Sequence, residues 1–297
     1  MKLFLASLTK HILEEVHKRF PEKRINILRS FGVPHSEDYN FFHTHRDMFD
    51  KLMYDCGCFT LNNPQASQEA KDRVKSETYL EQVLNIQDQC DYISSFDPDW
   101  SDDCIDTNLY YYTKLKKAGV KNLFPVIHNP RTEVNCLIDM GVEMVAIGSV
   151  LIRRLDAIGP IVRKLHKAGI KVHFFGTTTF AINSQVPIYS CDSASWAKTG
   201  SFGEIIWWNP YKEVWDPTEK VYMEEYIHLD KQKTNCFSTY KYLTEFEEYL
   251  WNTFKFTHED FFGKKRHQNL HLVNTYYYLQ LEDRINEEQQ KRGLLVE

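Results

Sequence analysis

The feature that most constrains the fold is a regular alternation of short apolar runs with longer amphipathic segments. Runs such as 123–127 and 144–147 have the length of buried strands, and the segments between the runs have helical periodicity. Several helical segments end in a glycine, at Gly119, Gly141 and Gly169, as helix C-termini commonly do. Strands that alternate with helices predict a parallel sheet.

Seven or eight such strand–helix units favour an α/β fold of the (β/α)8 TIM-barrel type. An open, doubly wound sheet is the alternative, but no GxGxxG motif follows the first strand. The opening MKLFLASL predicts that first strand, because its apolar run is too short for a signal peptide. EIIWW at 204–208 is a candidate last strand. Beyond it the chain reads as helical, so we predict a barrel domain at 1–235 and a helical C-terminal extension at 236–297.

Charge and cysteine content narrow the classes of function. The net charge of −5 excludes a globally basic nucleic-acid coat, so any nucleic-acid contact needs a local basic patch. The seven cysteines are odd in number and irregularly spaced, which favours free thiols and a cytoplasmic location. No apolar stretch approaches the length of about 18 residues that a membrane span needs.

Three carboxylates stand where predicted strands end. Asp55 ends one strand, Asp97 follows another in SSFDPDW, and Asp192 follows PIYSC. In a barrel these ends share one rim, where paired carboxylates can act as nucleophile and general acid/base. For each aspartate alone, a role as a helix N-cap is an equal alternative.

Further residues at the same strand ends are small, aromatic or basic. An isolated Phe is more often part of a core, and an isolated His is more often structural, so these residues carry weight only as a group. They are Phe59, His128, Gly148, Ser149, Phe175 and Gly176.

The sequence motifs of these segments resemble those of the tRNA-guanine transglycosylase superfamily. DCGCFT is similar to that family's DSGGYQ loop, AIGS to its AIGG turn, FFGTTT to its MGVG turn, and YSCDSASW to its nucleophile segment. SFDPDW resembles its strand that ends in a base-reading aspartate. The resemblance covers roughly residues 50–205 and is closest to the phage and bacterial branch that places 7-deazaguanines in DNA.

The resemblance implies roles for these positions. Asp192 would be the nucleophile and Asp55 the general acid/base. Base binding would involve Asp97 and His128 at the edge of the base, Phe59 and Phe175 on its two faces, and close backbone approach at Gly148, Ser149 and Gly176.

The implied reaction is that of a pentosyltransferase, which exchanges guanine for a preQ0-like 7-deazaguanine through an aspartyl-glycosyl ester. It requires no cofactor or catalytic metal. The family's zinc quartet has no counterpart here, since the one C-x-C, Cys56–Cys58, lies inside the candidate site loop; we interpret these cysteines as small loop fillers. DNA is the expected polymer, with tRNA as the alternative, together with a free 7-deazaguanine base and a helper protein or second copy of the chain.

Candidate nucleic-acid contacts lie outside the rim. The basic run at 263–268 supplies Lys264, Lys265 and Arg266, and Trp196 is a candidate for stacking on unpaired bases. For short basic runs a solvated surface is the default reading.

Two other functions remain open from the sequence. HxH at His43 and His45, together with His128 and an aspartate, would suit a metal-dependent barrel hydrolase. A catalytically silent nucleic-acid-binding relative is the other reading.

Overall fold

The computed structural model describes residues 1–33, 41–148, 154–223 and 235–296. The chain forms two compact units. Unit 1 contains residues 1–13, 24–193 and 282–297, and unit 2 contains residues 14–23 and 194–281. Each unit is described separately below. The cut after residue 193 precedes the boundary predicted at residue 235.

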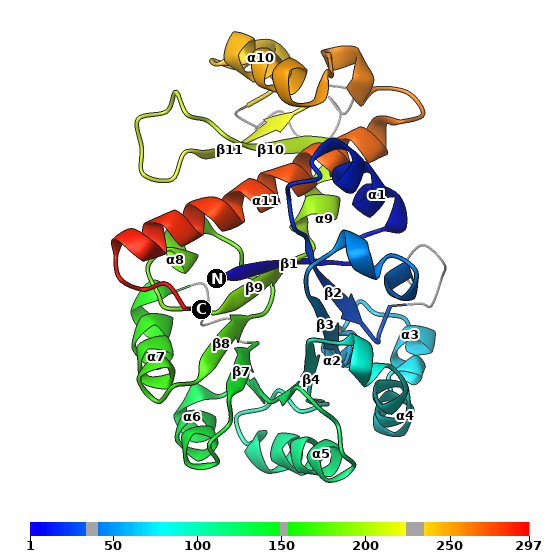
Figure 1. Ribbon diagram of the computed structural model, residues 1–297, viewed down its shortest axis with the longest axis vertical. Helices are drawn as coiled ribbons and strands as arrows, with labels where there is room; N and C mark the ends of the chain where they lie inside the picture. Colours follow the sequence, from blue (N-terminus) through cyan, green and yellow to red (C-terminus); the bar gives the residue numbers. More distant parts are fainter. Residues whose placement is uncertain (34–40, 149–153, 224–234, 297) are drawn as a thin grey trace. The chain divides into compact units, whose positions relative to one another are not determined.

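Unit 1 is an α/β barrel, as predicted. Its sheet has nine strands, all paired in parallel, in the order β5-β4-β3-β2-β1-β9-β8-β7-β6 (Figure 1). The strands are β1 (Lys2–Ala6), β2 (Asn26–Ser30), β3 (Leu52–Asp55), β4 (Tyr92–Ser94), β5 (Leu123–Phe124), β6 (Val126–Ile127), β7 (Met144–Ile147), β8 (Lys171–Phe174) and β9 (Ser190–Ser193).

The two edges of this sheet are consecutive in the chain, so the sheet is nearly closed. β5 pairs with β4 and β6 pairs with β7, and only Pro125 separates β5 from β6. Proline has no N–H to give to a ladder, which interrupts the strand, yet the Pro125 carbonyl still accepts from the Ala146 N–H at 2.9 Å. Counted as one strand, 123–127 makes this an eight-stranded TIM-like barrel.

Helices connect most of these strands. They are α1 (Lys10–Arg19), α2 (Cys58–Asn62), α3 (Gln68–Arg73), α4 (Ser76–Ile86), α5 (Ile105–Lys117), α6 (Pro130–Asp139), α7 (Leu155–Lys167) and α8 (Phe180–Asn183). The expected C-terminal glycines are confirmed, because Gly119, Gly141 and Gly169 follow α5, α6 and α7 with φ of +88°, +63° and +76°.

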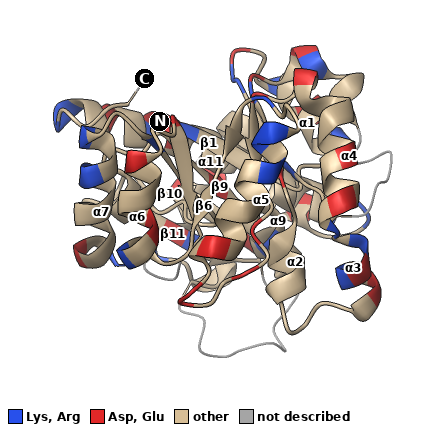
Figure 2. Cartoon of the chain, turned by 90° about the horizontal axis from the view of Figure 1, so that it is seen from below, with Lys and Arg blue, Asp and Glu red and all other residues tan. Residues whose placement is uncertain are grey.

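The charges of α5 and α7 follow their dipoles. Asp106 and Asp156 lie in the first turns, and lysines lie in the last turns (Figure 2). This order is electrostatically favourable for the helices and accounts for basic residues at the amino end of the barrel. These lysines therefore have a structural explanation that needs no ligand.

The barrel interior is filled by side chains that alternate inward along the strands. Phe4, Leu28, Met53, Phe124 and Met144 belong to one buried cluster. Burying each large apolar side chain stabilises the fold by about 1.5–3 kcal/mol. The interior of the barrel is thus a packed core, and a catalytic site is expected at the carboxyl ends of the strands.

The EIIWW segment is not a barrel strand, contrary to the prediction. It forms β10 (Glu204–Trp208), which pairs antiparallel with β11 (Thr218–Tyr222) in a separate two-stranded sheet of unit 2. Trp207 is buried there and donates its indole N–H to the Tyr240 hydroxyl at 3.0 Å. An apolar run of this length specifies a buried strand but does not specify its partner.

The other described elements of unit 2 are helices. The predicted helical extension at 236–297 is divided between the two units, because residues 282–297 belong to unit 1. Unit 2 contains α9 (Ser195–Ser201), α10 (Leu243–Phe254) and most of α11 (Arg266–Lys291). The last turns of α11 belong to unit 1, where the Gln289 side chain donates to the carbonyls of Asn183 and Val186 at 2.8 and 3.0 Å. Among the described helices, none is long and apolar enough to cross a membrane.

Candidate active site

The three predicted aspartates lie at the carboxyl ends of barrel strands and converge. Asp55 ends β3, Asp97 follows β4, and Asp192 lies in β9. Only β1 and β2 separate β9 from β3 around the barrel wall. The negative charges of Asp97 and Asp192 both raise the pKa of Asp55, in agreement with this placement.

Asp55 occupies an environment that favours its protonated form. Burial, followed by the charge of Asp97, raises the pKa of its carboxyl to about 7, with Asp192 adding a smaller contribution. The Ser30 hydroxyl at 2.8 Å and the Gly57 N–H at 3.0 Å donate to Oδ2 and act in the opposite direction. Ser30 is directly opposite Asp55 in the β2–β3 register, which fixes this contact.

Asp192 is held by one of its two oxygens. The Gly176 N–H donates to Oδ1 at 2.8 Å, and His173 Nε2 lies 3.3 Å from the same atom. His173 is fully buried, and its Nδ1 lies 2.8 Å from the Ser190 hydroxyl. Both contacts on the carboxylate fall on Oδ1, so an attack on a substrate would use Oδ2.

Asp97 and His128 form a buried pair. His128 Nε2 lies 2.6 Å from Asp97 Oδ2, while Asp97 Oδ1 accepts from the Cys56 thiol at 2.7 Å. The His128 backbone N–H donates to Glu133 at 2.7 Å. Both Asp97 oxygens therefore have partners in this structure, and a base edge that binds Asp97 would replace one of them.

The aromatic wall differs from the expected sandwich. Phe59 on α2 is 66% exposed, but its aromatic neighbour is Trp100, with ring centroids 6.0 Å apart. Trp100 also stacks on His128 at 5.1 Å. Phe175 is half-buried and meets His173 edge-on at 4.7 Å. Trp100 stands in SFDPDW and is not among the residues that the sequence analysis assigns to the site, although a Trp just after a predicted strand end is a stacking candidate.

The glycines of the rim have different physical roles. Gly176 has φ +65°, and a Cβ there would meet nothing within 4 Å, so the space above it is open. A Cβ at Gly148 would lie 3.2 Å from His128 Cε1, so this position keeps room for the imidazole. Ser149 lies outside the described residues.

The C-x-C loop is shaped by Gly57, which has φ +79° and packs against Gly32 so closely that a Cβ would lie 2.3 Å from the Gly32 nitrogen. This left-handed turn directs both flanking thiols inward, and Cys56 and Cys58 are buried. Burial raises the pKa of each thiol, and the charge of Asp97 adds to the effect. All seven cysteines of the chain are free thiols, as predicted.

The residues predicted to contact nucleic acid differ in their exposure to solvent. Trp196 is 1% exposed and packs edge-on against His271 at 5.3 Å within unit 2, so it is not available to stack on bases, contrary to the prediction. Lys264 and Lys265 are exposed just before α11, and Arg266, its first residue, is half-buried.

The histidines of the HxH motif do not join this group. They lie in the connection from β2 to β3, where His43 ends a 3-10 turn and His45 precedes Arg46. Arg46 pairs with Asp91, which stands before β4, at the opposite end of the barrel from His128. The structure therefore does not assemble the alternative metal site.

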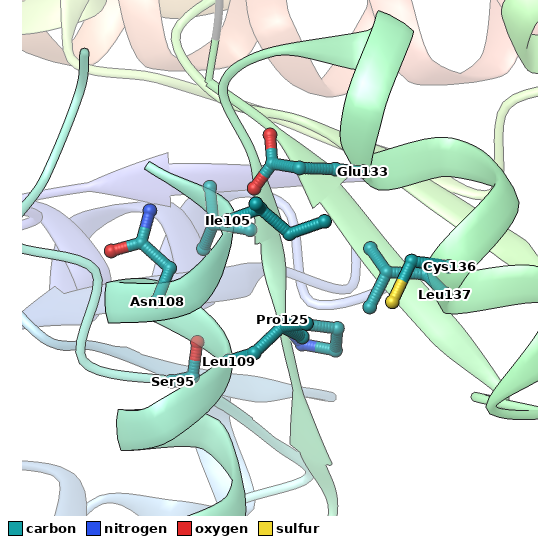
Figure 3. Close-up of a pocket in the computed structure, with 9 residues that line it drawn as sticks. Ser95, Ile105, Asn108, Leu109, Pro125, Glu133, Cys136 and Leu137 are labelled. Atoms are coloured by element: carbon teal, nitrogen blue, oxygen red, sulfur yellow. The ribbon is translucent and has the colours of Figure 1, made fainter. Parts of the chain in front are cut away.

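Two of the hollows among the described residues are lined without any of the three aspartates. One, between α5 and α6 above Pro125, has a free volume of about 10 Å³, the size of a single water molecule (Figure 3). The other, of about 630 Å³, lies at the amino end of the barrel, with Asn122, Glu143 and Lys171 in its lining. Neither contains any of the three converging aspartates.

Comparisons with models of protein families and with curated proteins found no match for this chain. The geometry of the rim and the sequence resemblance are therefore the two grounds for a function.

Proposed function

We propose that the chain is a transglycosylase that exchanges guanine for a 7-deazaguanine in nucleic acid through an aspartyl-glycosyl ester. The observation that supports it most strongly is the convergence of Asp55 and Asp192 at one rim of the barrel. Two carboxyl groups on opposite sides of a sugar can divide the work of nucleophile and proton carrier.

In the first half of the reaction, Oδ2 of Asp192 attacks C1′ of the target nucleoside. The bond from C1′ to the base nitrogen breaks, and its electron pair leaves with the guanine. Asp55 supplies the proton that the departing base takes up. The hydrogen bond from the Gly176 N–H to Oδ1 supports this role, since it fixes the carboxylate by the oxygen that does not react.

In the second half, the incoming 7-deazaguanine gives a proton to Asp55 and attacks C1′. The ester bond breaks, and its electron pair returns to Asp192 as a free carboxylate. Two inversions at C1′ retain the β configuration. The ester keeps the sugar activated, so the exchange consumes neither a nucleotide triphosphate nor a redox equivalent.

The remaining rim residues suit a flat, polar base. Trp100 and Phe59 offer exposed ring faces beside the Asp97–His128 pair, which presents hydrogen-bonding atoms at the edge. Open space above Gly176 leaves room for a ring to approach the backbone near Asp192. The target base has to leave its stack to reach such a site.

DNA is the polymer that we propose, on the strength of the sequence resemblance, with tRNA as the alternative. The exposed Lys264 and Lys265 are candidates for phosphate contact. With a net charge of −5, a helper protein or a second copy of the chain is part of the proposal. Seven free thiols fit a cytoplasmic location.

The test is transfer of labelled base. The full chain is incubated with labelled preQ0 or guanine and with duplex DNA, single-stranded DNA or bulk tRNA, and each polymer is recovered and counted. We expect label in DNA with the wild-type chain. Asp192→Asn should reduce incorporation at least roughly 1000-fold, as expected for loss of a nucleophile.

The matched control is Asp139→Asn, which changes an exposed aspartate at the end of α6 and should leave incorporation unchanged. Label in tRNA alone would show that tRNA, the alternative polymer, is the substrate. Failure of both polymers to gain label, with nucleic-acid binding retained, would support the silent relative and contradict the proposal.

A further inference from the structure

Cys56, Cys58 and Asp97 bring three metal-binding atoms together in the wall of the rim. Their two Sγ atoms and one carboxylate oxygen all lie within 4.8 Å of one another, and all three residues are buried. The residues come from two different strand ends, since Cys56 and Cys58 follow β3 and Asp97 follows β4. Convergence of this kind is set by the barrel and not by local sequence alone.

The loop that carries the thiols is held in place by backbone donors. The Cys56 N–H donates to the Ser94 hydroxyl at 2.9 Å, and the Cys58 N–H points at the Cys56 Sγ at 3.5 Å. The left-handed turn at Gly57 places both thiols on the same side of the loop.

His128 supplies an outer contact of the type found around metal ligands. Its Nε2 lies 2.6 Å from Asp97 Oδ2, so that Oδ1 is the carboxylate atom that faces the sulfur. Ligating groups in metal sites are commonly oriented by such a hydrogen-bonded neighbour. The Asp97–His128 pair thus fixes the direction in which Oδ1 points.

We propose that Cys56, Cys58 and Asp97 bind one Zn²⁺ ion, with His128 orienting Asp97 and a fourth position left open. Two thiolates and a carboxylate are ligands that zinc accepts, and three protein ligands with an open position are typical of zinc sites that bind a further molecule. The charge of the cation offsets the negative charge that the three groups would otherwise gather in a buried place.

The ligand atoms need only a small rearrangement. Zn–S and Zn–O bonds of roughly 2.3 and 2.1 Å at a tetrahedral angle separate sulfur from oxygen by about 3.6 Å. Cys56 Sγ and Asp97 Oδ1 are 2.7 Å apart, so they must separate by about 0.9 Å, which lies within the reach of side-chain rotation.

This inference does not depend on the transglycosylase proposal, because it is tested without nucleic acid or base. The full chain, purified under a phosphine reductant, is dialysed against micromolar zinc and its metal content is measured by mass spectrometry. Cobalt(II) then replaces zinc, and thiolate-to-cobalt charge-transfer absorption reports on sulfur ligation. We expect one metal ion per chain and a charge-transfer band.

The variants separate ligands from neighbours. Cys58→Ser and Asp97→Asn should weaken zinc binding by more than about 100-fold, and His128→Ala by about 10–100-fold with the band retained. The control is Cys90→Ser, which removes a buried thiol before β4 whose Sγ contacts the Ile86 carbonyl, and it should bind zinc as the wild type does.

X-ray absorption of the zinc-loaded wild type keeps the test decisive if a variant fails to fold. The proposal predicts two sulfur neighbours at about 2.3 Å. A first shell of nitrogen and oxygen only, a wild-type chain that takes up no zinc at micromolar concentration, or a folded Cys58→Ser variant that binds zinc like the wild type would each overturn it.

Discussion

Glu282 on α11 should make unit 1 less stable as the pH rises. Burial raises the pKa of its carboxyl from 4.5 to about 7, although the Leu3 N–H and the Asn26 side chain, at 3.2 Å, both donate to it. Between those two values the folded state binds more protons than the unfolded state. The contribution of Glu282 to stability is therefore fully present below pH 4.5 and is lost as the pH rises through about 7.

The magnitude follows from the difference between the two pKa values. A difference of about 2.5, at about 1.36 kcal/mol for each pH unit, amounts to about 3.4 kcal/mol, which is an upper value for a partly buried group. Glu282→Gln keeps an acceptor and cannot ionise. It should match the wild type near pH 4.5 and exceed it by up to about 3 kcal/mol at pH 8.

Urea unfolding of the full chain at pH 4.5, 6, 7 and 8 measures this difference. Glu287→Gln changes an exposed glutamate on the same helix and is the matched control, with no pH-dependent gain expected. Equal free energies of unfolding for the wild type and Glu282→Gln at every pH would refute the reasoning. So would a gain that appears only at low pH.

Three further predictions concern single residues. Gly57→Ala should cost about 2 kcal/mol or more in unfolding free energy, because it combines a positive φ with a backbone clash; Gly119→Ala, with φ +88° and open space, should cost less. Trp100→Ala should raise the KM for the incoming base by roughly 5-fold or more and change kcat little, because stacking contributes about 1–3 kcal/mol per base. The label-transfer assay measures both parameters. An unchanged KM would show that Trp100 does not contact the base. Trp196→Ala should destabilise unit 2 by about 3–5 kcal/mol in urea unfolding, because it removes a buried indole, and should leave the DNA affinity of the folded chain unchanged. A loss of DNA affinity without a loss of stability would show that Trp196 contacts the nucleic acid.

The barrel could be predicted because it rests on a local pattern, and the same pattern places a candidate site at its strand ends. Runs such as Leu123–Ile127 are apolar throughout, as strands covered on both faces have to be. Parallel strands place their carboxyl ends on one edge, so Asp55, Asp97 and Asp192 could be grouped without coordinates. The charges of Asp97 and Asp192 raise the pKa of Asp55, in agreement with that grouping.

The parts that sequence did not predict depend on contacts between distant residues. Trp207 lies in an apolar run that suits a barrel strand equally well, and only its pairing with β11 places it in unit 2. Trp196 is buried against His271, a residue 75 positions away in the chain. His173 lies beside Asp192, and Trp100 stacks on His128. These pairs are far apart in the sequence, so the sequence alone does not predict their contact.

The most direct test of the central claim is to trap the sugar on the protein. The chain is mixed with a guanine-containing DNA oligonucleotide without an incoming base, quenched, digested with protease and analysed by mass spectrometry. The account predicts a glycosyl adduct on the peptide that contains Asp192, absent from Asp192→Asn and present with Asp139→Asn. An adduct on a different carboxylate, or undiminished base exchange by Asp192→Asn, would contradict it.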